Sequence, residues 1–136
     1  MGASKLGISR HYSTASFVID GDGFLPAIGT WGIIGPFDFD VKIIRATALL
    51  NVSGSCVIDL WKGTVAEYIA GTITNGDSIV ASAPLTVSGA LGAEDTTLTG
   101  WNTLLQAGYV LIPELESVAT ATAIYASLGL RRGGTP

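Results

Sequence analysis

The stretch from Val41 to Lys62 constrains the fold more than any other part of the 136-residue chain. Two apolar runs, each long enough for a strand, flank the turn-rich segment 51–54. Short apolar runs on either side of such a segment are typical of two antiparallel strands joined by a tight turn. The pattern therefore predicts a β-hairpin with its turn at residues 51–53.

The hairpin predicts a definite register between its two strands. One face would be wholly apolar, and its cross-strand pairs would be Ala48 with Cys56, Ala46 with Ile58, and Ile44 with Leu60. The other face would be mixed, and it would hold an ion pair between Arg45 and Asp59. A slip of one residue would turn the apolar set to the wrong side, so the pattern specifies this register.

Other short strands are predicted on both sides of the hairpin. They are expected at 15–19, irregularly around 31–34, at 37–40 as a half-buried edge, and at 78–81, 95–100, 108–115 and 117–130. Residues 65–70 and 101–107 read as short helical turns or connections, and residues 84–93 as a surface loop. About eight short strands without a long helix predict an all-β fold, an antiparallel β-sandwich of jelly-roll type.

The predicted strands form one domain with a tail at each end. Residues 1–14 are polar and small, so we expect an extended N-terminal arm outside the core, either flexible or laid on a neighbouring subunit, with a disordered terminus as the alternative. Residues 15–130 form the single β-sandwich domain, and residues 131–136 form a C-terminal tail. No internal repeat or linker divides the domain.

The chain is poor in charge for its size. Charged residues make up 13% of it and hydrophobic residues 48%, against a usual charged fraction of ~25%. Such a domain exposes apolar patches unless another copy or a partner protein covers them, so we expect a homo-oligomer or a lattice component. The 7 basic residues are scattered, apart from one adjacent pair, and the net charge is −4, so nucleic acid is not an expected partner.

No membrane association is expected from the hydropathy pattern. The longest apolar runs are shorter than the ~18 residues that a membrane-spanning helix needs. The first ten residues contain no apolar segment of the kind found in secretory signals. The expected partners are therefore proteins rather than lipid or nucleic acid.

Residues suited to catalysis or metal binding are few. The one histidine, His11, lies in the polar arm, where no rigid scaffold would hold it beside a nucleophile. The segment 20–23, DGDG, resembles the start of a calcium loop but lacks the later ligands, so a plain turn is favoured. A looser cation site with Asp38 or Asp40 remains an alternative.

A second acidic pair lies on a predicted strand. Glu114 and Glu116 alternate around Leu115, so both side chains would point the same way, and a solvated strand edge fits them better than a catalytic pair. No glycine-rich phosphate loop is present. We therefore expect no catalytic, cofactor-binding or metal-binding residues, no cofactor and no enzymatic activity. Cys56, the one cysteine, is expected to be a buried small hydrophobe.

Aromatic residues are the best candidates for a contact surface. Three tryptophans, Trp31, Trp61 and Trp101, could stack on a glycan, but such residues are more often core or interface anchors. Trp61 falls on the mixed face of the hairpin, so its burial would require an oligomer contact or a covering loop. The predicted interface residues are Trp31, Phe37, Phe39, Trp61, Trp101 and Tyr125.

Three segments, taken in order, resemble one known family. Residues 54–62, GSCVIDLWK, resemble a "GSxVIDIWK" strand, and residues 95–101, DTTLTGW, resemble a later "DSTLTGW" stretch. The start VIDG at 18–21 agrees as well, and the resemblance extends from about Ser16 to Leu130. The family consists of small structural proteins encoded by tailed bacteriophages.

The resemblance implies a β-sandwich protein of the virion without catalysis. A capsid decoration (cement) protein is the expected role, because the chain is a single compact domain with an arm and little charge. It would bind the outer capsid surface as an oligomer, by analogy a homotrimer, and stabilise the shell. Its partners would be itself and the major capsid protein or another virion protein, and it would pass through the host cytoplasm during assembly. A tail, baseplate or head-fibre component and a carbohydrate-binding module are the alternatives.

Overall fold

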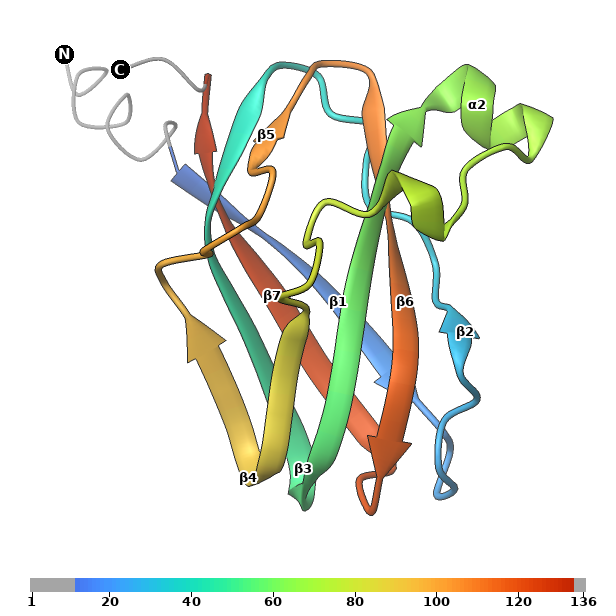
Figure 1. Ribbon diagram of the computed structural model, residues 1–136, viewed down its shortest axis with the longest axis vertical. Coiled ribbons are helices and arrows are strands. Elements are labelled where there is room, and N and C mark those ends of the chain that lie inside the picture. Colours follow the sequence, from blue (N-terminus) through green and yellow to red (C-terminus); the bar gives the residue numbers. More distant parts are fainter. Residues whose placement is uncertain (1–11, 134–136) are drawn as a thin grey trace, which may run out of the picture.

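The structure is a computed structural model, and it describes residues 12–133. It contains seven strands in one curled antiparallel sheet, so the expected all-β fold is confirmed, with seven strands rather than eight. The strands are β1 (Tyr12–Asp20), β2 (Gly29–Thr30), β3 (Val41–Thr64), β4 (Leu85–Asp95), β5 (Leu104–Leu105), β6 (Tyr109–Ala119) and β7 (Ala123–Arg132). The helices are α2 (Val65–Ala70) and the 3₁₀ turn η1 (Asn75–Asp77) (Figure 1).

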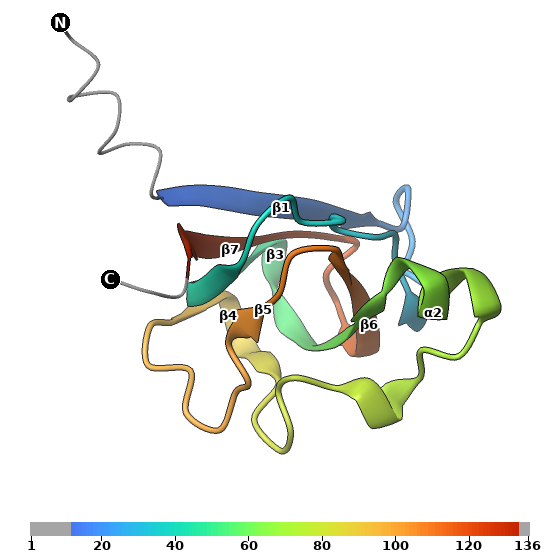
Figure 2. The ribbon, with the colours of Figure 1, turned by 90° about the horizontal axis from the view of Figure 1, so that it is seen from above.

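The sheet folds over on itself and forms two facing layers (Figure 2). Residues 41–50 of β3 pair with β7, whereas residues 55–64 of β3 pair with β6. β4 makes the same change of layer, because residues 92–95 pair with the first half of β3 and residues 85–87 with its second half. One layer is therefore β1, β7 and the first half of β3, and the other is β2, β6 and the second half of β3.

The predicted register within residues 41–62 is wrong. The two halves of β3 lie in opposite layers, and no pairing joins one half to the other among the described residues. Ala48 and Cys56 are both buried, but they lie in opposite layers instead of side by side. An apolar face on each strand fits both arrangements, so the alternation identified the buried side chains but not the partner strand.

A β-bulge also changes which residues of β3 face inward. The register with β7 shifts between Ile43 and Arg45, which leaves Ile44 as the extra residue. Ile43 is therefore 1% exposed, whereas Ile44, the residue expected to face inward, is only partly buried. Bulges reverse the alternation of a strand at one point, and a sequence pattern of strict period two does not include them.

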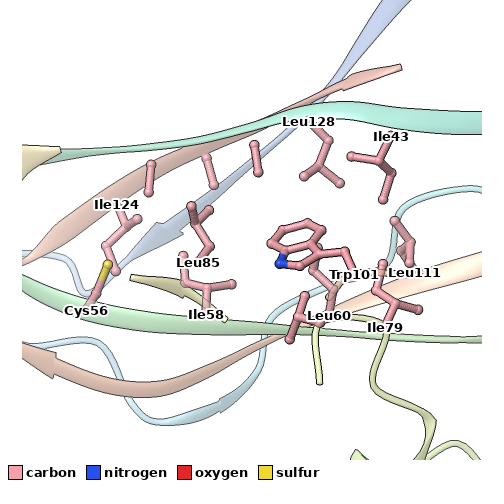
Figure 3. Close-up of a cluster of buried hydrophobic side chains, with 14 of the residues drawn as sticks. Ile43, Cys56, Ile58, Leu60, Ile79, Leu85, Trp101, Leu111, Ile124 and Leu128 are labelled. Atoms are coloured by element: carbon pink, nitrogen blue, oxygen red, sulfur yellow. The ribbon is translucent and has the colours of Figure 1, made fainter. Parts of the chain in front are cut away.

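The core lies between the two layers. Ile43 and Leu128 project from one layer toward Ile58 and Leu60 of the other, and Trp101 lies among them (Figure 3). Each of the four aliphatic side chains is at most 1% exposed. Complete burial of one such side chain contributes about 1.5–3 kcal/mol relative to an exposed one. This packing holds the layers together without a disulfide.

Several predicted element boundaries differ from the structure. β1 begins at Tyr12 and β7 ends at Arg132, so part of the expected arm and tail belongs to the sheet. The expected loop at 84–93 is most of β4, and the expected strand at 78–81 makes only a single bridge through Ser78. His11 and the rest of the arm lie outside the described residues.

Two of these differences have visible causes. In the segment 95–100 only Asp95 belongs to a strand, and the rest forms a turn, because the Asp95 carboxylate accepts hydrogen bonds from the backbone N–H groups of Thr97 and Leu98. The long strand expected at 117–130 is interrupted at Thr120, whose φ of 73° places it in the left-handed region. The interruption lets β6 and β7 lie in different layers.

α2 projects from one end of the sandwich and buries none of its residues. A capping box closes its first turn, since the Glu67 N–H donates to Thr64 Oγ1 and the Thr64 N–H donates to Glu67 Oε1. Gly71 ends the helix in the left-handed conformation. Neither α2 nor η1, the helices within residues 12–133, is long and apolar enough to cross a bilayer.

Candidate functional site: an exposed apolar row and an acidic cluster

An exposed apolar row crosses the outer face of the layer that contains β1. Val18 of β1 lies opposite Tyr125 of β7, which lies opposite Leu49 of β3. Leu49 in turn pairs with Gly92 of β4, and Leu91 lies next to this glycine. The side chains of Val18, Tyr125, Leu49 and Leu91 are 53%, 49%, 54% and 62% exposed. We call these four residues the apolar row.

A glycine makes room for part of this row. A Cβ atom at Gly92 would lie 2.8 Å from Leu49 Cδ2, so the leucine side chain lies across the bare backbone of β4. Thr47, Leu49, Leu91 and Gly92 line a shallow depression there. The face thus offers a flat apolar strip with a hollow at its β4 end, which is a shape that a protein surface can fill.

The two charged residues on the Thr47 side of the apolar row are paired with each other. Ser16, Ser127 and Thr47 form the adjacent row across the strands. Arg45 lies 3.6 Å from Glu94 in an ion pair, and Glu94 also accepts a hydrogen bond from Thr47. The predicted ion pair of Arg45 with Asp59 is therefore wrong, because the two residues lie in different layers. Pairing lowers the cost of covering Arg45 and Glu94, whereas Asp20, two residues from Val18 on the same side of β1, forms no ion pair within residues 12–133.

The predicted interface residues lie in different places. Tyr125 belongs to the apolar row, and Phe39 is 41% exposed with the Arg132 guanidinium 4.1 Å from its ring centre. Trp31 and Phe37 are partly buried and pack against the core. Tyr125 and Phe39 are therefore exposed, whereas Trp31 and Phe37 lie at the margin of the core.

Trp101 is a core residue, so its prediction as an interface residue is wrong. Its side chain is 9% exposed, and its indole N–H donates to the Ala83 carbonyl at 2.7 Å. Burial between the layers also removes it from any glycan platform of three tryptophans. Sequence reasoning weighed a core role for Trp101, and only the folding of the sheet decides between the two.

Trp61 lies beside an acidic cluster that the sequence did not predict. Asp59, Glu114 and Glu116 form this cluster, and their carboxylate oxygens lie within 4.8 Å of one another. Asp59 is only 7% exposed and accepts hydrogen bonds from Ser78 Oγ at 2.6 Å and from its neighbour's backbone N–H. The Trp61 indole N–H donates to its other oxygen at 3.3 Å.

The pKa values of the two glutamates in the cluster are raised. Burial raises the pKa of Glu114, and the negative charge of Asp59 adds to this effect. Burial, Asp59 and Glu114 together raise the pKa of Glu116. Like charges at this spacing favour protonation of one partner, so the cluster can take up a proton as the pH falls.

Sequence reasoning found part of this cluster. The alternation around Leu115 predicts that Glu114 and Glu116 point the same way, which agrees with their meeting in one cluster. It missed Asp59, although a single acid inside the apolar run VIDLW is a signal that a buried carboxylate needs partners.

The other acidic residues named in the sequence do not gather into a site. Asp20 accepts a hydrogen bond from the Asp22 N–H at 2.8 Å, as expected of a plain turn. The Asp40 carboxylate accepts from the Ala107 N–H. Within residues 12–133, Asp59, Glu114 and Glu116 are the one group of three acidic, histidine or cysteine side chains close enough to share an ion.

Cys56, the one nucleophilic thiol, is buried in the core. It is 1% exposed, and burial raises the pKa of its thiol. A thiol that stays protonated and covered is a poor nucleophile. Cys56 therefore acts as the small apolar side chain that the sequence predicts.

A small depression lies next to the end of α2. It is lined by Trp61 and Tyr68 together with Thr30, Gly71 and Ile112. Two aromatic side chains beside a depression are a possible stacking surface for a sugar ring.

Comparisons with known proteins give likenesses of fold only. No family model matches the sequence, and no curated protein matches it. The NLP core of Drosophila, whose structure was described for pentamer formation and histone binding, is similar with a TM-score of 0.43 and 10% identity over 90% of this chain and 97% of that chain.

Two further solved structures are similar over most of this chain. One is a chain of the cyanophage Pam1 capsid, with a TM-score of 0.35 and 12% identity, covering 90% of this chain and 82% of that chain. The other is the carbohydrate-binding module CBM36 in complex with calcium and xylotriose, with a TM-score of 0.34 and 12% identity, covering 90% of this chain and 72% of that chain. All three TM-scores lie below 0.5 and all three identities are 12% or less, so these likenesses assign neither a family nor a function.

Proposed function

We propose that the protein is a non-enzymatic structural component of a virion, and specifically a capsid decoration protein that binds the outer surface of the shell as an oligomer. The apolar row is the observation that carries this proposal. It places Val18, Tyr125 and Leu49 on one outer face, with Leu91 beside Leu49 at the β4 end, in a chain with few charges. The resemblance of residues 54–62 and 95–101 to a family of phage structural proteins supports the same role.

The apolar row suits a protein contact better than a small-molecule site. Its members come from four adjacent strands, so their relative positions are fixed by the sheet. A large apolar side chain that is half exposed contributes about 1 kcal/mol when a partner covers it. Four such residues at the centre, with paired charges at the rim, match the usual anatomy of a protein interface.

The proposed assembly is a homotrimer at three-fold positions of the capsid lattice. Its partners are other copies of the chain and the major capsid protein or another virion protein. The proposal follows the analogy with decoration proteins and the expectation that low charge favours wide contacts between subunits. Neither nucleic acid nor membrane takes part.

A binding experiment with expanded capsids tests the proposal. We expect wild-type protein to sediment with capsids, and Leu49→Glu to bind at least tenfold more weakly, because a buried unpaired charge opposes the contact. Ile69→Glu on α2 is the matched control, since Ile69 is 78% exposed but lies outside the apolar row. No binding by the wild type, or an equal loss with Ile69→Glu, contradicts the proposed role of the apolar row.

The location in the virion requires a separate measurement. Antibody labelling of intact virions should mark the capsid faces if the protein is a decoration protein. Label confined to the tail, baseplate or fibres would instead identify a tail-associated structural component, which is the alternative structural role.

A second candidate function is glycan binding at the depression beside Trp61 and Tyr68. Its support is the pair of aromatic side chains lining one hollow. A glycan array probed with wild type, Trp61→Ala and Tyr68→Ala tests it. The candidate requires binding by the wild type that both variants lose, and an array with no bound glycan excludes it.

A further inference from the structure

The strand edges of the sheet differ in how well they are protected. Free edges attract other strands through unpaired N–H and C=O groups, and natural sheets block them with short strands, bulges, prolines or charges. β2 and β5 are only 2 residues long. β4 shows register shifts against β3 and ends with Glu94 and Asp95. Each of these edges therefore has at least one such device.

β1 has only one of these devices, a single aspartate at its last position. It is 9 residues long, YSTASFVID, and it contains no proline, lysine, arginine or glutamate. Its register with β7 runs from Tyr12 to Asp20 without a shift, so no bulge interrupts the edge. Asp20, at the very end, is its only charged residue.

The outer edge of β1 is free among the described residues. β1 lies at the end of the strand order and pairs only with β7. No backbone hydrogen bond from a loop within residues 12–133 reaches residues 12–20. Because alternate peptide groups of a strand point to each side, about half of the N–H and C=O groups of β1 have no protein partner there.

We infer that β1 pairs antiparallel with β1 of a second copy about a two-fold axis at Ser16. This inference rests on the self-association part of the proposed function. The pairing places Ser16 opposite itself, Thr14 opposite Val18, and Tyr12 opposite Asp20. No two like charges meet, since the two Asp20 carboxylates lie at opposite ends, separated by eight residues or about 26 Å, which exceeds the ~8 Å screening length at physiological salt.

The inner side of the same strand favours this partner. Ala15 and Phe17 point toward the core and pack against it, but both remain partly exposed because they lie at the edge. In the symmetric pairing Ala15 of one copy lies opposite Phe17 of the other. A small residue opposite a large one fills the space without a clash, and each phenylalanine gains cover.

The two-fold contact is distinct from a three-fold contact. It can join two trimers or form a dimer by itself. The experiment therefore has to detect the contact between the two β1 strands, because the number of subunits does not identify it. An edge pairing of this kind continues the layer of one copy into that of the next, which links subunits along a shell.

Cysteine cross-linking tests the proximity of the two strands. In the symmetric pairing the two Ser16 Cα atoms lie about 4.5–5.5 Å apart, which suits a disulfide. We expect Ser16→Cys to form a covalent dimer under mild oxidation, seen on a non-reducing denaturing gel. Ser127→Cys is the matched control, because Ser127 is the β7 partner of Ser16 on the same face but one strand inside the edge. The buried Cys56 does not interfere.

A charge exchange tests the pairing without covalent chemistry. Ser16→Lys and Ser16→Glu should each raise the dissociation constant of the dimer about tenfold, because like charges would meet at the axis. An equimolar mixture of the two variants should restore association, measured by sedimentation velocity. This recovery separates the contact from a simple folding defect.

Two results would overturn the inference. One is equal cross-linking of Ser16→Cys and Ser127→Cys, and the other is sedimentation that the charge variants leave unchanged, as expected if another segment of the same chain covers β1. Capsid binding with no cross-link at Ser16 would reject the β1 contact and leave the proposed function standing. A cross-link without capsid binding would support the β1 contact and reject the proposed binding to the capsid.

Discussion

Asp59 shows how much the role of one residue depends on the layer in which it lies. In the sequence it is the natural partner of Arg45 across a hairpin turn. In the structure Arg45 binds Glu94, and Asp59 is held by hydrogen bonds from Ser78 and Trp61. Desolvation raises the pKa values of the two neighbouring glutamates, and the negative charge of Asp59 adds to this effect.

The raised pKa of Glu116 predicts the sign of a pH effect. A carboxyl group whose pKa is raised by folding stabilises the protein most when protonated, and this contribution is lost as the pH rises through the folded-state pKa. We therefore expect Glu116→Gln to be more stable than wild type at pH 7, with a difference that vanishes below the ordinary glutamate pKa of 4.5. Urea unfolding at several pH values measures it.

The matched control for this variant is Asp38→Asn. Asp38 is exposed and lies outside the acidic cluster, so its replacement removes one negative charge without relieving the crowding. A gain in stability at pH 7 that is equal for both variants would mean that net charge, and not the cluster, causes the effect.

The thiol of Cys56 provides a second test at the residue scale. Its burial and raised pKa predict that it reacts with a thiol reagent roughly a hundredfold more slowly in the native protein than in urea. The absorbance of the released chromophore measures the rate. Fast labelling of the native protein would show that the core opens easily at this position.

At the scale of elements, β3 is the strand that decides the architecture. It leaves one layer at Leu50 and enters the other at Gly54. β4 and the connection between β6 and β7 cross from layer to layer beside it. Gly54 is needed there because a Cβ atom would lie 2.5 Å from the Ala119 carbonyl oxygen and 3.1 Å from the Ala121 nitrogen. Close approach of two backbones is a position that only glycine fills without a shift.

Replacement of Gly54 by alanine should therefore destabilise the passage between the layers. We expect Gly54→Ala to lower the free energy of unfolding by about 1–3 kcal/mol, as for an overpacked site, measured by urea denaturation. Gly76→Ala is the control, since the nearest atom to its Cβ would be Thr74 Oγ1 at 3.4 Å, an ordinary contact. Equal stability of the two variants would mean that the strands move apart without cost.

At the scale of the whole molecule, the core between the layers stabilises the fold, whereas the outer faces are available for contacts with other molecules. The inner faces hold the fold together through side chains such as Leu60, which is 1% exposed. The outer face of the β1 layer contributes little to folding, because its apolar row is already half exposed. It is therefore free to serve contacts with other molecules.

A pair of leucine variants separates these two kinds of surface. Leu60→Ala should lower the free energy of unfolding by about 2–5 kcal/mol, since it leaves a cavity between the layers. Leu104→Ala, at a residue that is 50% exposed, should change it by about 0.5 kcal/mol or less. Thermal unfolding followed by circular dichroism compares them, and similar losses would argue against a core confined to the space between the layers.

The sequence by itself determined the all-β class, the buried faces of the principal strands and the burial of Cys56. These follow from side-chain alternation and from the position of polar residues, which are local properties of the chain. In the strand expected at 117–130, for example, Ile124, Ala126 and Leu128 alternate along the chain, and all three are buried.

Only the tertiary structure decided which strands are neighbours and which residues meet at the surface. Two strands with inward apolar faces have the same alternation in sequence whether they lie side by side or in opposite layers. The alternation indicates which side chains are buried but not which strand is the neighbour. The apolar row and the acidic cluster both join residues that are distant in the chain, such as Val18 with Tyr125 and Asp59 with Glu114. Trp101 entered the core for the same reason, since the folding of the sheet created the space that it fills.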